Sequence, residues 1–110
     1  MSILRESARG QHCLVRLPGC NHTTITTVLA HLNGAGIGIK HDDLFGAFAC
    51  SNCHDEIDGR TLRLPRDVVI LGFFWGMQRT QQFWKDSGYI QIVNPPVLRI
   101  QDFGLGVDYI

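Results

Sequence analysis

The four cysteines of the chain stand in two pairs that could share one metal ion. Cys50 and Cys53 form a Cys-x-x-Cys, and Cys13 and Cys20 stand seven residues apart further upstream. Two short loops that each supply two thiolates can close a tetrahedral zinc site without a preformed cavity. Four cysteines are few for a disulfide scaffold, and closely spaced thiols in a reducing compartment more often bind a metal. We therefore predict a structural zinc ion on these four sulfurs.

Two other interpretations of the cysteines stay open. They could be buried free thiols, or Cys50 and Cys53 could be a redox pair, although no βαβ context supports the second. Three histidines, His12, His22 and His54, each lie within two residues of a cysteine and could replace a sulfur. We favour four thiolates. His54 directly follows Cys53, so in a helix its side chain can turn away from the zinc toward a second site.

The sign of the charge changes in the middle of the chain. Residues 40–58 carry one lysine and five acids, a net charge of −4, and residues 60–85 carry five bases and one acid, a net charge of +4. Such a pair of segments suits a cation-dependent site that also holds a phosphodiester, and Arg60, Arg63 and Arg79 are the candidate phosphate contacts. Ion pairs on a solvated surface are the alternative.

The whole chain has the size of one compact domain, with 110 residues of which 45% are hydrophobic. Ten basic and ten acidic side chains leave no basic excess, so a nucleic-acid interaction must come from a local site. No run of apolar residues is long enough to span a membrane, and the first residues lack the pattern of a signal peptide. We expect a cytoplasmic protein without membrane association.

The first half of the chain predicts a short helix and a β-hairpin. Residues 3–9 have helical spacing, and residues 12–17 and 24–32 have strand character on either side of a Pro-Gly turn. Residues 33–38 form a glycine-rich loop, but no strand-then-helix frame supports dinucleotide binding there.

The second half predicts two helices. Ser51 can cap a helix that has three acids in its early turns and ends at Gly59. A longer helix runs from Pro65 to about Asp86, and strand character returns around residues 89–93 and 97–100, beyond its end. One face of the long helix predicts core packing by residues at helical spacing: Val69, Phe73, Met77, Thr80 and Trp84.

The order of these motifs resembles the HNH (ββα-metal) endonucleases. After the first cysteine pair come Val28-Leu29-Ala30-His31, then Asp42-Asp43-Leu44, then the block from Ala49 to Arg60, which reads ACSNCHDEIDGR. The chain is still more similar to the YbcO-type prophage family described as nucleases, in which Cys-x-Val-Arg-x-Pro-Gly, Leu-Ala-His and Cys-Ser-x-Cys-His-Asp-Glu-Ile-Asp recur. The helix with Met77-x-Arg79-Thr80-Gln81-x-x-Trp84 also resembles that family.

The resemblance implies a fold and a division of the chain. The expected fold is α+β, a small zinc-stabilised ββα-metal domain with an additional long C-terminal helix. It covers roughly residues 4–92, so we expect a nuclease domain over residues 1–92 and a C-terminal extension over residues 93–110.

The activity implied by the resemblance is that of a metal-dependent DNA endonuclease of phage or prophage origin. His31 matches the general base, and His54 matches the histidine that binds one Mg²⁺ or Mn²⁺ ion. Asp58 lies four residues after His54 and shares its helix face, as a second ligand should. Asp43 lies near the position whose side chain braces the loop that carries the base.

Two positions depart from the family pattern. Many HNH enzymes have a metal-binding acid before the first histidine, where this chain has Ala30, so fewer protein ligands are left for the cation. The middle position is Asp43 at a slightly different spacing, and Asp42 or His41 could serve instead.

A different class of function is compatible with the same residues. Ala30 and the zero net charge favour a zinc-stabilised module without catalysis that binds nucleic acid or a host or phage recombination protein. A structural protein whose tail mediates assembly is a third interpretation. The form of the DNA and the oligomeric state stay open.

Overall fold

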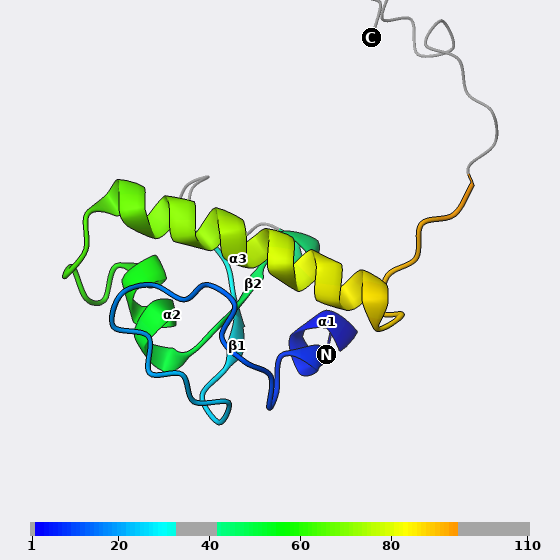
Figure 1. The fold of residues 1–110 in the computed structure, drawn as a ribbon, viewed down its shortest axis with the longest axis horizontal. Helices are drawn as coiled ribbons and strands as arrows, with labels where there is room; N and C mark the ends of the chain where they lie inside the picture. Colours follow the sequence, from blue (N-terminus) through cyan, green and yellow to red (C-terminus); the bar gives the residue numbers. More distant parts are fainter. Residues whose placement is uncertain (1, 33–41, 95–110) are drawn as a thin grey trace, which may run out of the picture.

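The structure, a computed structural model, describes residues 2–32 and 42–94 (Figure 1). The predicted glycine-rich loop, His41 and the predicted strand at 97–100 lie outside the described residues. The elements are α1 (Ile3–Ser7), β1 (Val28–Ala30), the 3₁₀ turn η1 (Asp43–Phe45), β2 (Ala47–Ala49), α2 (Ser51–Asp58) and α3 (Arg66–Asp86). Within the described segments, no helix is both long and apolar enough to cross a bilayer.

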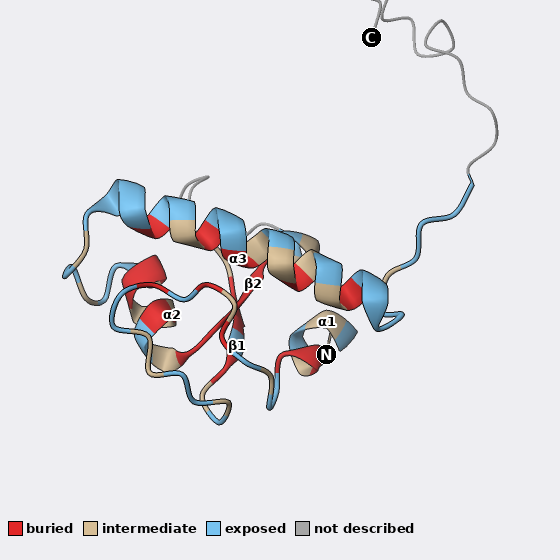
Figure 2. Ribbon diagram, viewed as in Figure 1, coloured by how far each residue is buried: buried red, intermediate tan, exposed pale blue. Residues whose placement is uncertain are grey.

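A small antiparallel sheet lies at the centre of this α+β domain. β1 pairs with β2, with Val28 opposite Ala49 and Ala30 opposite Ala47. α3 crosses the strands on one face, and α2 and α1 flank them on opposite sides (Figure 1). The buried residues of α3 are on the side that faces the strands (Figure 2). The strands therefore hold α1 and α2 in fixed positions on one layer, and α3 closes the core behind them.

The long helix confirms the prediction for residues 65–86 and for its buried face. Four of the five predicted stripe residues are buried, and Met77 is partly buried. Thr80 accepts a hydrogen bond from the Phe48 amide at 3.0 Å, and Trp84 packs edge-to-face on the Phe48 ring at 5.9 Å. Trp84 also donates its indole N–H to Ser7 at 2.7 Å. α3 thus joins the central strand β2 to α1.

The predicted hairpin is wrong. Residues 12–17 form no strand, because Arg16 has a left-handed backbone with a φ of +57° that an extended strand cannot continue. Both Leu14 and Val15 instead donate their amides to the Phe48 carbonyl, at 2.9 and 3.3 Å. The partner of β1 is β2, whose three residues Ala-Phe-Ala carry little strand signal. The strand expected around residues 89–93 is also absent from the described chain.

The start of α2 corrects a second prediction. Cys50 rather than Ser51 is the N-cap, with its sulfur accepting the Cys53 amide, and no acid lies in the first turn. The three acids lie in the second turn, where they cannot benefit from the positive end of the helix dipole. The helix ends as predicted, because Gly59 adopts a left-handed φ of +77° that favours glycine.

Candidate metal centre and candidate active site

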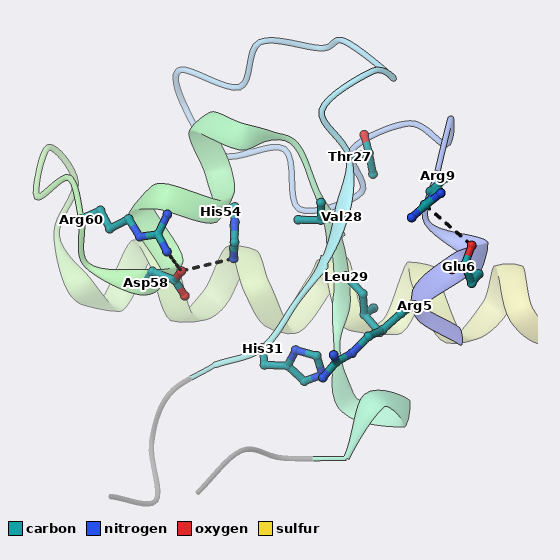
Figure 3. A pocket seen from close by; sticks show the side chains of 10 residues that line it. All are labelled: Arg5, Glu6, Arg9, Thr27, Val28, Leu29, His31, His54, Asp58 and Arg60. Carbon is teal, nitrogen blue, oxygen red and sulfur yellow. Dashed lines mark ion pairs between the residues drawn. The ribbon is translucent and has the colours of Figure 1, made fainter. Parts of the chain in front are cut away.

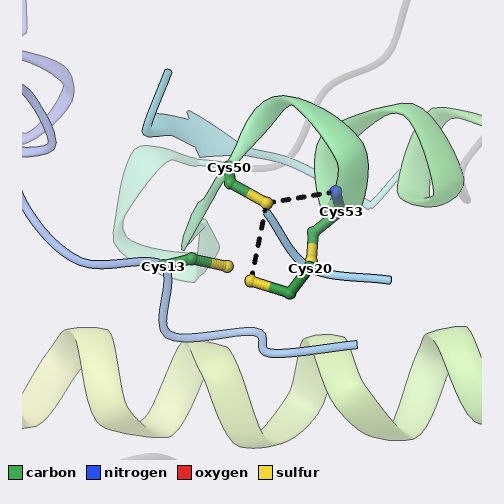
Figure 4. Close-up of side chains that lie close together, drawn as sticks. All are labelled: Cys13, Cys20, Cys50 and Cys53. Atoms are coloured by element: carbon green, nitrogen blue, oxygen red, sulfur yellow. Dashed lines mark hydrogen bonds between the residues drawn. The ribbon is translucent and has the colours of Figure 1, made fainter. Parts of the chain in front are cut away.

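The four cysteine sulfurs converge, as the spacing predicts (Figure 4). All four lie within 4.8 Å of one another, and the sulfurs of Cys20 and Cys50 are 3.6 Å apart. Zinc–sulfur bonds of about 2.3 Å in a tetrahedron place the sulfurs about 3.8 Å apart. The four cysteines therefore fit a structural metal such as zinc. Within residues 2–32 and 42–94, they are the one group of three or more metal-ligating side chains close enough to hold an ion.

Two backbone turns aim these sulfurs at one point. The Arg16 amide donates to Cys13 Sγ and the Cys53 amide donates to Cys50 Sγ, each at 3.5 Å. An amide that donates to sulfur stabilises the thiolate form. The first turn needs the left-handed backbone of Arg16, and the second is the first turn of α2. The ligand geometry is thus set by local backbone structure.

The protonation of the cysteines also suits a cation. A hydrogen bond from Cys53 lowers the pKa of Cys13 to about 4, whereas burial raises the pKa of Cys20 to about 11. The hydrogen bond to Cys13 and burial also raise the pKa of Cys53. The Cys13 thiolate is therefore stabilised by hydrogen bonds from the protonated thiols of Cys53 and Cys20. A soft divalent ion would replace those protons and bind all four sulfurs as thiolates.

A cleft of about 550 Å³ lies between α1, β1 and α2 (Figure 3). Four of the predicted site residues line it: His31, His54, Asp58 and Arg60. The residue after β1 is the first, and α2 with the short segment after it supplies the others. The opposite wall is α1 with the residues just after it, and it contributes Arg5, Glu6 and Arg9. The structure thus brings the two predicted histidines into one open space.

His31 is held by the predicted bracing residue. It follows β1 directly, and its Nε2 lies 2.8 Å from Asp43 Oδ1, while Arg5 Nε lies 3.3 Å from the same oxygen. A hydrogen bond from Ser2 lowers the pKa of Asp43; burial opposes it, and His31 and Arg5 lower the pKa further. An ionised carboxylate only accepts hydrogen bonds, so Nε2 of His31 donates in this contact, and in the neutral form of the ring Nδ1 carries the free lone pair.

α2 presents a nitrogen and an oxygen ligand on its cleft face. His54 Nε2 lies 3.2 Å from Asp58 Oδ2, as expected for side chains four apart on a helix. Arg60 Nη2 lies 3.6 Å from the same oxygen, because the left-handed Gly59 turns the chain back toward the helix. Carboxylate and imidazole groups with open positions for water suit a hard divalent cation. The side chain of His54 therefore points to the cleft and not to the cysteines.

The two other predicted arginines lie elsewhere. Arg63 Nε is 3.2 Å from the carboxylate of Glu56, whose side chain is 2% exposed, and Arg79 donates to the Leu14 carbonyl at 2.8 Å. Arg60 also lies near Asp55, at 3.8 Å. Some arginines of the basic segment therefore form ion pairs with carboxylates of the acidic segment. A nucleic-acid contact by Arg63 or Arg79 stays a prediction.

Two arginines near the N-terminus, Arg5 in α1 and Arg9 just after it, are functional candidates that were not predicted from the sequence. Arg5 and Arg9 line the cleft opposite Arg60, and Arg9 lies 3.7 Å from Glu6. The available signal was their spacing of four residues within the predicted helix at 3–9, which places both side chains on one face. A five-residue terminal helix is a weak signal by itself, so only its packing against β1 and η1 assigns that face.

Comparison with known proteins identifies the family. The family model described as "Putative nuclease YbcO" matches residues 2–89. The chain belongs to the YbcO family. It is 44% identical over 95 residues to "Putative nuclease YbcO" of Escherichia coli (strain K12) and, to the same extent, to "Putative nuclease ybcO" of Enterobacteria phage 82. These matches cover 83% of this chain and 99% of each relative.

A solved structure has a similar fold. "Structure of a putative bacteriophage protein from Escherichia coli str. K-12 substr. MG1655" matches with a TM-score of 0.69 and 42% identity, covering 78% of this chain and all of the other. The residues matched by the family contain both the cysteine site and the cleft. The resemblance to YbcO proteins drawn from the motifs is confirmed. The division of the chain at residue 92 stays a prediction.

Proposed function

We propose that this YbcO-family chain is a metal-dependent endonuclease of the HNH type that hydrolyses phosphodiester bonds in DNA. The observation that carries the proposal is the shared cleft: His31 directly follows β1 and the His54–Asp58 pair comes from α2, yet both line one space. The order β1, β2, α2 matches the ββα motif, and the relatives are named as nucleases. One of those relatives belongs to a phage, which supports a phage or prophage origin.

In this proposal His31 is the general base. Its Nδ1 accepts a proton from water, the water oxygen bonds to phosphorus, and the bond from phosphorus to one ester oxygen breaks. That oxygen takes up a proton from solvent, and the products are an alcohol and a phosphate monoester. Asp43 positions the ring by accepting the Nε2 proton and stabilises the imidazolium that forms.

His54 Nε2 and Asp58 Oδ2 would hold the catalytic Mg²⁺ or Mn²⁺ ion. Such a cation, when bound, neutralises the negative charge that develops on the phosphate and on the leaving oxygen. Two protein ligands are compatible with Mg²⁺, which keeps several waters. Asp58 is 19% exposed in its side chain and already lies beside Arg60, so the arginine would be free to turn toward a phosphate when the cation binds.

Arginines on both walls would hold the backbone of the substrate. Arg5 stands on α1, Arg9 follows its C-terminal end, and Arg60 stands after α2. A guanidinium can bind a phosphate through two parallel hydrogen bonds, which gives both affinity and orientation. This local group of arginines could bind a phosphate backbone even though the whole chain has no excess of basic residues.

The test is nicking of supercoiled plasmid and cleavage of circular single-stranded DNA, with Mg²⁺, with Mn²⁺ and with no added cation. We expect cation-dependent cleavage that His31→Ala abolishes without a change in circular dichroism. His12→Ala is the matched control, because His12 is exposed and does not line the cleft. It should cleave like the unchanged protein.

Retained cleavage in His31→Ala would remove His31 from the role of base. A folded, zinc-loaded protein that binds DNA in a salt-sensitive way and never cleaves it would support the module without catalysis. Binding to a host or phage recombination protein would then be the next property to measure.

A further inference from the structure

A second groove, of about 250 Å³, lies between residues 15–18 and α3. It shares no lining residue with the cleft that holds His31. Its floor is apolar, with Leu17, Pro18, Val68 and Leu71, and Trp75 forms part of its wall. Trp75 is 48% exposed and meets the ring of Phe74 at 5.8 Å in an edge-to-face contact, so a large part of the indole is open to solvent beside this groove.

Two glycines of α3 let the loop approach closely enough to form the groove. A Cβ atom on Gly76 would stand 2.6 Å from Val15 Cγ2 and 2.8 Å from Val15 Cα, and a Cβ atom on Gly72 would collide with the side chain of Leu17. Real Cβ atoms do not tolerate such distances, so the loop rests directly on helix backbone. Trp75, between the two glycines, stands at the edge of this contact.

Two cations stand on the rim of the groove. Arg16 is exposed, and its left-handed backbone is held by the hydrogen bond to Cys13 Sγ. Arg79 uses one guanidinium nitrogen for the Leu14 carbonyl, at 2.8 Å. A guanidinium has five N–H donors, so this bond orients Arg79 and leaves donors for an anion.

The lining of the groove among the described residues contains two arginines and no acid. Its chemistry is therefore complementary to an anion that also carries flat apolar groups. Unpaired nucleobases stack on exposed aromatic rings while arginines hold the flanking phosphates, whereas the bases of a duplex are already stacked on each other. A protein partner would also gain from burying Trp75, but it would have to bring separate acidic groups for the two arginines, whereas a nucleic-acid strand carries phosphates and flat bases together.

We propose that this groove binds single-stranded nucleic acid, with a base stacked on Trp75 and phosphates on Arg16 and Arg79. The proposal rests on the proposed function only in taking nucleic acid as the substrate. It deepens that function by adding a second binding site, away from the cleft, that selects unpaired strands. Because Arg16 is held by the turn at Cys13, the site depends on an intact cysteine cluster.

The test is fluorescence anisotropy of labelled dT20 and of a labelled 20-base-pair duplex on the zinc-loaded full chain, with no added divalent cation. Loss of one stacked base is worth about a five- to a hundredfold change in affinity. Trp75→Ala should raise the Kd for dT20 by that factor and leave the duplex Kd unchanged. Tyr89→Ala is the matched control, because Tyr89 is 40% exposed, lies beyond the other end of α3 and stacks on Phe83. It should leave both values unchanged.

A second variant separates stacking from charge. Arg16→Asn keeps a residue that tolerates the left-handed backbone and removes one phosphate contact. It should weaken dT20 binding and reduce the slope of log K against log salt by about one.

An unchanged dT20 affinity in Trp75→Ala would overturn the proposal, and so would an equal loss of duplex affinity. A change in molecular size in Trp75→Ala with unchanged dT20 binding would assign the surface to contact between copies of the chain instead. The fate of the nuclease proposal is measured separately, because His31→Ala should retain dT20 binding. A protein that never cleaves but binds dT20 through Trp75 would keep this site and lose the catalytic one.

Discussion

The cysteine site and the histidine cleft lie side by side on α2, yet they are built in opposite ways. Three of the four cysteines are buried, and their sulfurs contact one another. The side chains of His54 and Asp58 stay 29% and 19% exposed and face open space. Cys53 and His54 are adjacent, and a helix turns about 100° per residue, so one step along α2 separates a closed site from an open one. A closed site satisfies its own ligands, whereas an open site leaves lone pairs for something else.

This contrast separates the consequences of damage. Ligand binding at a closed cluster contributes to folding, because the cluster does not exist in the unfolded chain. Loss of a cleft residue should remove the proposed catalysis and leave the packing of α3 on β2 intact.

The largest effect should come from Cys53→Ser. It removes a buried ligand, so we expect loss of bound zinc and loss of the cooperative unfolding transition. His54→Ala, one residue later, should keep the zinc and the fold and lose cleavage. Circular dichroism, metal analysis of the purified proteins and plasmid nicking measure the three properties. A native circular dichroism spectrum and full zinc content in Cys53→Ser would contradict the claim that the cysteine site, unlike the cleft, is needed for folding.

Asp43→Asn should mainly affect catalysis. The amide can no longer hold the Nε2 proton of His31 as a charged acceptor, and the loss of such a carboxylate beside a general-base histidine costs up to about 10⁴-fold in kcat. We expect that fall in kcat with little change in KM. Asp42→Asn is the control, because Asp42 accepts the Leu44 amide at the start of η1 and does not contact His31. An equal fall in both variants would mean that the loop, and not the carboxylate beside His31, matters.

Gly76→Ala should destabilise the fold even though alanine is the better helix former. The added Cβ would meet Val15 backbone and side chain at 2.6–3.1 Å. Overpacking destabilises the fold, and the gain in helix propensity offsets only part of this loss. The net loss of unfolding free energy should be about 1–2 kcal/mol. Urea denaturation measures this value, with Gln78→Ala at an exposed position of the same helix as control. Unchanged stability would show that the cysteine-bearing loop can lift from α3.

The smallest effect concerns the acid stability of the cleft. Hydrogen bonds from Ser2 and His31 and the nearby Arg5 charge lower the pKa of Asp43 below its ordinary value of 3.8. The ionised carboxylate therefore stabilises the folded state above that ordinary value, and this contribution is lost as the pH falls through the lowered pKa. Asp43→Asn should reduce the unfolding free energy at pH 7, and the difference should shrink toward pH 3. Urea denaturation at pH 7, 5 and 3 tests the sign, and a difference that grows toward low pH would contradict it.

Local signals in the sequence were sufficient for much of the architecture. The Cys-x-x-Cys, the period of the apolar residues from Val69 to Trp84 and the glycine at 59 each act within a few residues, so their structural outcome was predictable. The predicted hairpin failed because the turn at Arg16 serves a cysteine and not a strand. Strand β2 was not predicted, because a strand of three residues is too short to show a periodic pattern.

The four converging thiols, the two main helices and the spacing of His54 and Asp58 follow from the sequence. Each of these depends on chain spacing and helical period, which are local quantities. Three other relations come from tertiary packing: β1 pairs with β2, His31 faces the α2 pair across a cleft, and two arginines in and just after α1 line the other wall. Those relations join segments far apart in the chain, and they are fixed by the packing of α3 on the sheet, which no short pattern encodes.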